Sequence, residues 1–193
     1  MNIHTIVLAA GEGSRMKSNR AKSLQRIGGT SMLEKICLTA GSISPKITLV
    51  VGFDKDSVIK ESKNYNLEIS TADQPKPIGT GDAVKCGIAE VEDGSKVLVL
   101  YGDVPLIKKE TLEELINSSD EGLSILTTVL KDPYGYGRVK KDDSGNALAI
   151  VEEKDASADE KNIKEIFTGV LCGQKELIEK GLAKLDNNNA AGE

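Results

Sequence analysis

The chain has few of the residues on which several common classes of protein depend. Its 193 residues include one histidine and three cysteines. The cysteines (Cys37, Cys86 and Cys172) are far apart and show neither Cys-x-x-Cys nor Cys/His spacing, which argues against a disulfide framework or a zinc site. We expect them to be small buried hydrophobic residues. The single histidine, His4, has no nucleophile or orienting partner nearby in the sequence, so a Ser-His-Asp or Cys-His hydrolase is not expected.

Long apolar runs and an excess of positive charge are also absent. No run approaches the roughly 20 apolar residues of a membrane-spanning helix, and the first run is too short and polar-flanked for a signal peptide. The 25 Lys+Arg against 30 Asp+Glu give a net charge of −5, whereas non-specific nucleic-acid binding needs clustered positive charge. We therefore expect a soluble cytoplasmic protein of one domain, with neither a membrane nor a nucleic acid as partner.

Short apolar runs alternate with helical patterns in the first part of the chain. Four strand-like runs are each followed by a helical pattern, which predicts a right-handed parallel α/β sheet. The strands are expected at residues 3–9, 47–51, 67–71 and 96–101. Helices are expected at residues 31–40, 82–91 and 109–116, and a further helix is expected to follow Asp54, which could cap it.

The pattern changes after residues 123–130. A hairpin is expected from 139–141 and 147–152, followed by a strand at 166–172 and an amphipathic helix at 176–185. The predicted fold is Rossmann-like, a mostly parallel sheet with a β-rich extension.

A glycine-rich loop, with Gly11 and Gly13, directly follows the first predicted strand. In an open parallel sheet, ligands bind beyond the carboxyl ends of the strands, where glycines let backbone N–H groups converge on phosphate oxygens. Arg15 and Lys22 add two cations near this loop. The loop matches neither the Walker pattern nor the dinucleotide fingerprint, so an ordinary turn with solvated surface charges remains the alternative.

The stretch Gly79-Thr80-Gly81 before a predicted helix is a second candidate segment. Its free N–H groups and hydroxyl suit phosphate or a base edge, and the side-chain amide of Gln74 can pair the edge of a pyrimidine. A Pro/Gly turn in which Asp82 or Thr80 caps the helix is the alternative.

Asp103 follows the buried-type strand at 96–101 and is the third candidate. A carboxylate held at that edge suits Mg²⁺, which keeps waters and takes substrate phosphate oxygens as its other ligands, although the residue could also cap a turn. The three segments are expected at one edge of one sheet. Together they suit phosphoryl or nucleotidyl transfer, which depends on charge neutralisation and positioning.

Several motifs in this order resemble one enzyme family. They are residues 8–16 with Lys22 downstream, 79–81, 101–106, 132–138, 150–155 and 187–193. The chain resembles, over essentially its whole length, the N-terminal uridyltransferase domain of the bifunctional N-acetylglucosamine-1-phosphate uridyltransferase / glucosamine-1-phosphate acetyltransferase family. The resemblance implies that UTP and N-acetylglucosamine 1-phosphate give UDP-N-acetylglucosamine and pyrophosphate, for bacterial cell-wall synthesis, with Mg²⁺ as cofactor.

The resemblance also implies roles for individual residues. The sugar-phosphate oxygen would attack the α-phosphorus in line, without an enzyme nucleophile. The backbone of Leu8, Ala9, Ala10 and Gly11, with Gln74, Gly79 and Thr80, would hold uracil and ribose; Arg15 and Lys22 would stabilise the phosphates; Asp103 would ligate Mg²⁺; Tyr101 and Gly102 would line the pocket; Gly137 and Glu152 would bind the sugar.

Two departures from the family pattern stand out. Phe167 stands where the family has a sugar-contacting asparagine, and losing a buried hydrogen-bond partner costs about 1–3 kcal/mol, so sugar affinity or choice is expected to differ. The sequence also lacks the stretch with a second metal-ligating asparagine and the β-helix domain. We therefore expect residues 1–193 to be an incomplete nucleotidyltransferase domain, without acetyl transfer and without the trimer-forming β-helix.

Other functions remain open at this point. The chain could bind a nucleotide with little or no turnover, or serve a related sugar phosphate. A dinucleotide-dependent oxidoreductase rests on Gly11-x-Gly13 alone and lacks an acidic residue after the second strand, where Gly52 and Phe53 stand.

Overall fold

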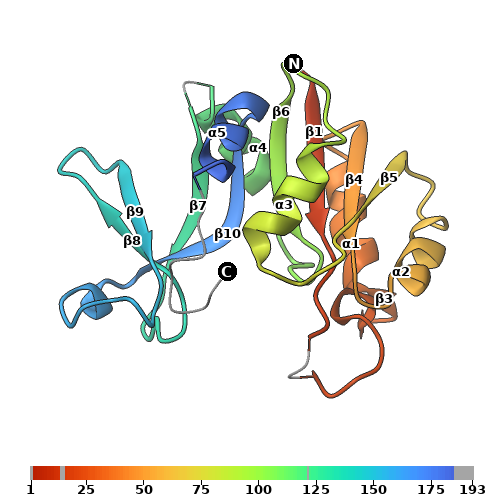
Figure 1. Cartoon of the computed structure of the whole chain (residues 1–193), viewed down its shortest axis with the longest axis horizontal. Coiled ribbons are helices and arrows are strands. Elements are labelled where there is room, and N and C mark those ends of the chain that lie inside the picture. The colour runs from red at the N-terminus through yellow and green to blue at the C-terminus, as the bar shows by residue number, and fades with distance from the viewer. Residues whose placement is uncertain (1, 14–15, 121, 185–193) are drawn as a thin grey trace.

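A computed structural model of the chain describes residues 2–13, 16–120 and 122–184. Its main sheet has eight strands in the order β5-β4-β1-β6-β10-β8-β9, with β7 also paired to β10 (Figure 1). The four strands β1 (Ile3–Leu8), β4 (Lys46–Val51), β5 (Ile69–Asp73) and β6 (Lys96–Tyr101) are mutually parallel. The predicted α/β fold with a parallel sheet is confirmed.

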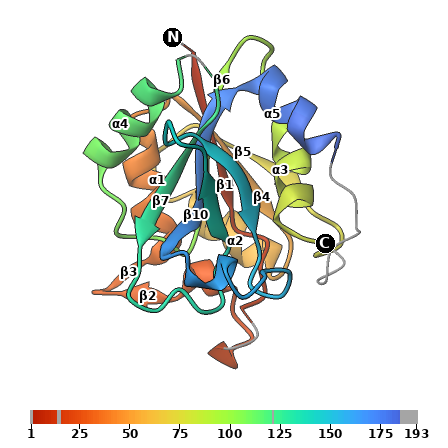
Figure 2. The ribbon, with the colours of Figure 1, turned by 90° about the vertical axis from the view of Figure 1, so that its left-hand side faces the viewer.

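Within the described residues, five α-helices cover the two faces of the parallel strands. Side chains of α1, α2 and α4 pack in one apolar cluster and those of α3 and α5 in the other, on opposite sides of the sheet (Figure 2). The helices are α1 (Met32–Gly41), α2 (Lys55–Ser62), α3 (Thr80–Ile88), α4 (Lys109–Ser118) and α5 (Lys175–Leu182).

The central strand β1 explains why its sequence reads as a continuous apolar run. Val7 packs in the first cluster, whereas Ile6 and Leu8 pack in the second. Ile6 and Val7 are fully buried. A strand covered by helices on both faces has no polar side, as is typical of parallel sheets.

The β-rich extension is antiparallel and is built around one long strand. It comprises β7 (Ser124–Val129), β8 (Arg138–Lys141), β9 (Ala147–Val151) and β10 (Glu165–Gln174). The second half of β10 pairs with β6, its first half pairs with β8, and β7 pairs with both halves. β10 therefore joins the projecting β8–β9 ribbon to the parallel half of the sheet (Figures 1 and 2).

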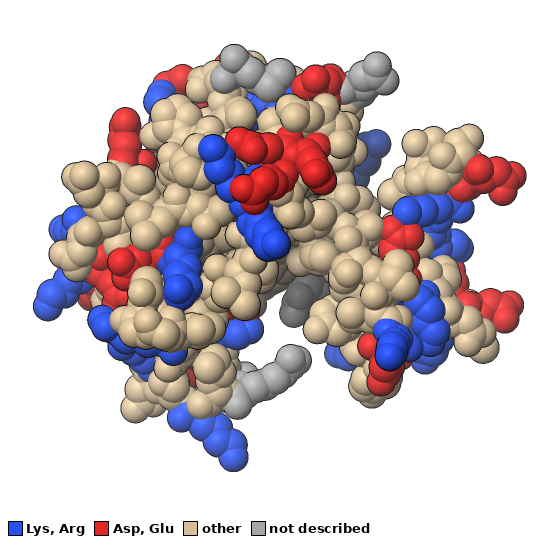
Figure 3. Space-filling model, turned by 180° about the vertical axis from the view of Figure 1, so that it is seen from behind, with Lys and Arg blue, Asp and Glu red and all other residues tan. Residues whose placement is uncertain are grey.

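Short elements complete the described chain. They are the 3-10 helices η2 (Lys22–Leu24) and η3 (Glu160–Asn162) and the small hairpin of β2 (Arg26–Ile27) and β3 (Thr30–Ser31). No helix in the described ranges is long and apolar enough to cross a membrane. On the face in Figure 3, the described basic and acidic side chains are interspersed.

The structure decides the three helix caps considered above. Asp54 occupies the N-cap position of α2, as considered, but its carboxylate makes no capping hydrogen bond and instead accepts the backbone N–H of Ala21 at 3.1 Å. Gly79 occupies the N-cap position of α3, so Thr80 and Asp82 lie inside the helix. The alternatives in which either residue caps that helix were therefore wrong.

The three cysteines are free thiols, as expected. Cys37 and Cys172 are buried in the first cluster, and burial raises the pKa of the Cys37 thiol to about 12. Cys86 is only partly buried, so the prediction of full burial fails for this residue.

The buried histidine of β1 makes stability depend on pH. His4 Nε2 lies 2.7 Å from Thr48 Oγ1, and burial, followed by the charge of Lys46, lowers the His4 pKa below its usual 6.5. The folded protein therefore binds fewer protons than the unfolded chain just below pH 6.5, so this residue's contribution to stability is present above that pH and is lost as pH falls.

We expect the loss to be at most about 1.4 kcal/mol per pH unit within this window. Urea unfolding at pH 7.5 and 5.5 measures it. The control is His4→Gln, whose amide can still form a hydrogen bond but does not titrate. Equal pH dependence in both proteins would contradict the prediction.

Candidate functional site

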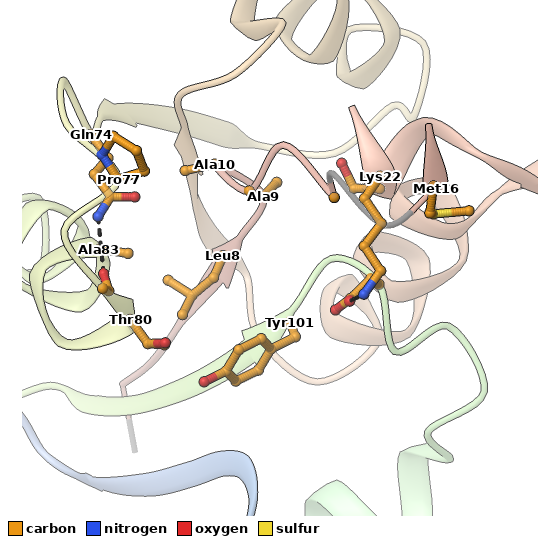
Figure 4. A pocket seen from close by; sticks show the side chains of 15 residues that line it. Leu8, Ala9, Ala10, Met16, Lys22, Gln74, Pro77, Thr80, Ala83 and Tyr101 are labelled. Atoms are coloured by element: carbon orange, nitrogen blue, oxygen red, sulfur yellow. Dashed lines mark hydrogen bonds and ion pairs between the residues drawn. The ribbon is translucent and has the colours of Figure 1, made fainter. Parts of the chain in front are cut away.

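A cavity of about 440 Å³ opens beyond the carboxyl ends of β1 and β6 (Figure 4). It brings together residues from all three candidate segments. Its lining residues are Leu8, Ala9, Ala10, Gly11, Gly13, Met16, Lys22, Ser23, Gln74, Pro77, Gly79, Thr80, Ala83, Tyr101 and Asp103. Every residue predicted to bind the nucleotide is in this set, together with Lys22 and Asp103. Arg15, the other predicted phosphate-binding cation, lies outside the described residues.

The loop after β1 is held against the neighbouring strand. Ala9 donates its N–H to the carbonyl of Val50 at 2.9 Å, and Ala10 accepts the N–H of Phe53 at 3.1 Å. These bonds fix the backbone that borders the cavity.

Gly13 is required by the close approach of this loop to Lys22. Its φ is +66°, and an added Cβ would lie 2.7 Å from the Cβ of Lys22. A larger residue here would be strained and would displace the lysine.

Gln74 presents a different group to the cavity from the one the sequence suggested. Its side chain is buried, and its Nε2 donates to the carbonyl of Gly79 and to Asp82 Oδ2, each at 3.0 Å. The donor half of the amide is thus committed to the protein, and the oxygen is directed toward the loop bearing Ala10 (Figure 4). Gln74 can therefore accept a hydrogen bond from a ligand but has little capacity left to donate one.

Lys22 and Asp103, which both line the cavity, form an ion pair. Lys22 begins η2, and Asp103 follows β6 by two residues. Both side chains remain partly exposed, with 44% and 25% of their surfaces accessible. The pair keeps an ammonium group and a carboxylate together, where a polyanion or a cation could draw either partner away.

Gly102 anchors Asp103 without lining the cavity. Its N–H donates to the carbonyl of Leu8 at 2.9 Å, and a Cβ added to Gly102 would lie only 3.2 Å from that oxygen. The tight contact between the ends of β1 and β6 therefore favours glycine at this position, directly before Asp103.

The cavity offers few protein ligands, so it suits only a metal ion whose other ligands are water molecules and substrate oxygens. Asp103 is the one carboxylate among the described residues lining the cavity, and the described chain has no cluster of three or more His, Cys, Asp or Glu that could hold a metal. Mg²⁺ commonly binds through one or two carboxylates, waters and substrate phosphates. One carboxylate in a cavity large enough to hold a phosphorylated ligand as well fits that mode.

A second cavity of about 560 Å³ adjoins the first and shares Thr80 and Tyr101 with it. Its wall is mostly apolar, and Glu152 is its one acidic residue among those described. The lining residues are Thr80, Gly81, Val84, Val99, Tyr101, Leu123, Glu152, Phe167, Thr168, Gly169, Leu171, Leu177, Ile178, Gly181 and Leu182. The structure thus places Glu152 and Phe167 beside the site, whereas Gly137 lies behind both of them.

Two contacts fix Gly137 behind that wall. Its carbonyl accepts the N–H of Phe167 at 3.0 Å, and an added Cβ would lie 3.0 Å from Glu152 Oε1. Gly137 therefore lies directly against Glu152 and Phe167 but lines neither cavity.

Gly169 shapes the shared wall and was not singled out from the sequence. Its φ is +89°, and an added Cβ would lie 2.7 Å from Cζ of Tyr101. The register of β10 shifts between Phe167 and Leu171, around this glycine. A glycine inside a predicted strand often marks such a bulge, so this signal was available in the sequence.

Comparison with known proteins decides the family. The model of the MobA-like NTP transferase domain matches residues 5–143. The chain belongs to this nucleotidyltransferase family. The enzyme class expected from the sequence is thereby confirmed.

The resemblance stated above is also confirmed at the level of relatives. The bifunctional protein GlmU of Neisseria gonorrhoeae is 44% identical over 192 residues, which are 99% of this chain and 41% of that protein. The protein of the same name from Ruthia magnifica subsp. Calyptogena magnifica is 41% identical over 193 residues, 100% of this chain and 42% of the relative. The chain therefore spans about two fifths of the length of these relatives.

Solved structures support the fold. A putative glucose-1-phosphate thymidylyltransferase from Bacillus anthracis superposes with a TM-score of 0.75 at 18% identity, covering 98% of this chain and 78% of the other. HddC from Yersinia pseudotuberculosis superposes with a TM-score of 0.70 at 23% identity, covering 92% and 79%. These likenesses confirm the predicted Rossmann-like architecture with its β-rich extension.

Proposed function

We propose that this chain transfers a uridylyl group from UTP to N-acetylglucosamine 1-phosphate, giving UDP-N-acetylglucosamine and pyrophosphate. The observation that carries the proposal is the single cavity that gathers the loop after β1, Gln74 with Thr80, and Lys22 with Asp103. The identity of 44% to a bifunctional protein GlmU supports it. The product would serve cell-wall synthesis in the cytoplasm.

Gln74 would select the base. Its oxygen accepts hydrogen bonds, while its donor atoms are held by Gly79 and Asp82. Uracil carries a donor at N3, whereas N3 of cytosine is an acceptor, so we expect UTP to be preferred over CTP. The backbone of residues 8–11 would hold the rest of the nucleoside, with Gly79 and Thr80 beside it.

Lys22 would act on the phosphates. An oxygen of the sugar phosphate attacks the α-phosphorus of UTP, the bond to the β-phosphate oxygen breaks, and pyrophosphate leaves with that oxygen. Lys22, together with Arg15 as proposed from the sequence, would stabilise the charge on the phosphates and the leaving pyrophosphate. A magnesium ion held by Asp103 would supply further neutralisation of charge when bound.

The second cavity would receive the sugar. Glu152 would accept hydrogen bonds from its hydroxyl groups, while Tyr101, with Gly102 behind it, would border the passage between the two cavities. Phe167 offers an apolar surface rather than a hydrogen bond. Other hexose 1-phosphates should therefore be compared with N-acetylglucosamine 1-phosphate.

The test is pyrophosphate release from UTP, Mg²⁺ and N-acetylglucosamine 1-phosphate, with identification of the sugar nucleotide formed. We expect release that depends on both substrates and falls when CTP replaces UTP. Absence of release with every sugar phosphate tested would contradict the proposal.

One observation favours a second candidate, a domain that binds the nucleotide with little turnover. The cavity's one described carboxylate is already paired with Lys22, which leaves few protein ligands for a metal. In that case calorimetry would detect binding of UTP while pyrophosphate release stays absent.

A further inference from the structure

An ion pair between a buried arginine and a partly buried glutamate lies at the base of the β8–β9 ribbon, outside both cavities. Arg138 begins β8, is 2% exposed, and forms strand pairs with Val151 of β9 and Ile166 of β10. Its Nη2 donates to Glu153 Oε2 at 2.5 Å, and its Nη1 donates to the carbonyl of Tyr136. The guanidinium therefore joins the start of β8 to the chain that leaves β9.

Glu153 connects further segments through the same carboxylate. Its Oε2 also accepts the backbone N–H of Gly135 at 3.2 Å, and its Oε1 lies 3.9 Å from Nζ of Lys161. The hydrogen bond from Arg138 comes first among the causes that lower the Glu153 pKa, followed by the N–H of Gly135. The carboxylate is thus charged near neutral pH and holds the turn before β8 in place.

One neighbour of this pair in sequence, Glu152, lines the second cavity, and the other, Gly137, lies directly behind it. Gly137 immediately precedes Arg138, and Glu152 immediately precedes Glu153. Glu152 lines the cavity, and a Cβ on Gly137 would lie 3.0 Å from its Oε1. Any shift of Arg138 against Glu153 would therefore move Gly137 against Glu152.

We infer that Arg138 and Glu153 are positioning residues whose ion pair sets the place of Glu152 and Gly137 at the sugar end of the site. The inference rests on the proposed function, in which that cavity receives the sugar. The pair touches neither cavity, so it acts only through its neighbours. Its loss should weaken binding of ligands that carry a sugar and leave the nucleotide end unaffected.

The experiment compares binding of UDP-N-acetylglucosamine and UTP, in the presence of Mg²⁺, by calorimetry. We expect Glu153→Ala to raise the Kd for UDP-N-acetylglucosamine about tenfold, as one hydrogen-bonding group loses its place, and to change the Kd for UTP less than about twofold. The matched control is Glu160→Ala, which removes another ion pair of the ribbon, the one to Lys140 at 2.8 Å. Both Kd values should stay unchanged in that control.

Arg138→Lys serves as the conservative second variant. Lysine keeps the positive charge but lacks the second nitrogen with which the guanidinium reaches both Glu153 and the carbonyl of Tyr136. We expect a smaller rise in the Kd for UDP-N-acetylglucosamine than in Glu153→Ala, and a folded protein by circular dichroism. If the pair had a merely structural role, both variants would instead raise the Kd values for UDP-N-acetylglucosamine and UTP to the same extent.

The outcomes separate the inference from the proposed function. If the wild-type protein binds both ligands and Glu153→Ala binds them as the wild type does, the positioning role is wrong and the proposed function stands. If the wild-type protein binds neither ligand, the proposed function fails and the inference fails with it.

Discussion

Replacing Asp103 with alanine should abolish turnover, lowering pyrophosphate release by at least about 10³-fold. Asp103 supplies the one carboxylate among the described residues that line the first cavity, so its loss removes the charged protein ligand available to magnesium. The rate is measured with UTP, N-acetylglucosamine 1-phosphate and Mg²⁺ at saturation. Manganese binding in the presence of UTP, followed by electron paramagnetic resonance, should weaken in parallel.

Asp73→Ala is the matched control for this prediction. Asp73 also stands at the carboxyl end of a parallel strand, as the last residue of β5, and pairs with Nζ of Lys55 at 2.9 Å. It lies outside the first cavity, so turnover should stay close to that of the wild type. Substantial magnesium-dependent activity in Asp103→Ala would refute the metal assignment.

Replacing Lys22 with alanine should lower turnover about 10²-fold or more, which is the scale of one lost charge stabiliser. The side chain lines the cavity and, among the described contacts, is anchored only by its partly exposed ion pair with Asp103. Exposed ion pairs are weak, about 0–1 kcal/mol, so a triphosphate can recruit the ammonium group at little cost. The kcat at saturating UTP and sugar phosphate measures the effect.

Two comparisons separate this role from that of Asp103. Lys55→Ala removes a lysine from an equivalent ion pair outside the first cavity, and we expect an unchanged kcat. Lys22→Ala should leave manganese binding at least as strong as in the wild type, because it removes the cation that neighbours the carboxylate. An unchanged kcat in Lys22→Ala would exclude Lys22 from catalysis.

Much of the fold was predictable because buried parallel strands have an unmistakable composition. The runs that form β1, β4 and β6 are almost wholly apolar, and the structure buries nearly all of their side chains. The polar strand β5 was placed two residues early, since only Ala72 of its five residues is buried and periodicity gave little guidance. The β-rich extension was predicted as strands, but its strand order was not.

The candidate site was predictable to the extent that it follows from sheet geometry. Parallel strands end at a common edge, so the loop after β1 and Asp103 after β6 had to lie near each other. The hydrogen-bond partners of each side chain, in contrast, could not be predicted from the sheet geometry. Gln74 was expected to offer its whole amide, yet Gly79 and Asp82 occupy its donors.

By itself the sequence determined the alternation of buried strands and helices, the glycine-rich loop at the edge of the sheet, and the kind of chemistry that its residues can support. These properties depend on local periodicity and residue type. Tertiary structure alone decided that β10 joins the ribbon to β6, that Lys22 pairs with Asp103, and that Arg138 meets Glu153 at the base of the ribbon. Such pairings depend on how segments that are distant in sequence pack together. Local sequence patterns do not determine which partner a buried or charged group will contact.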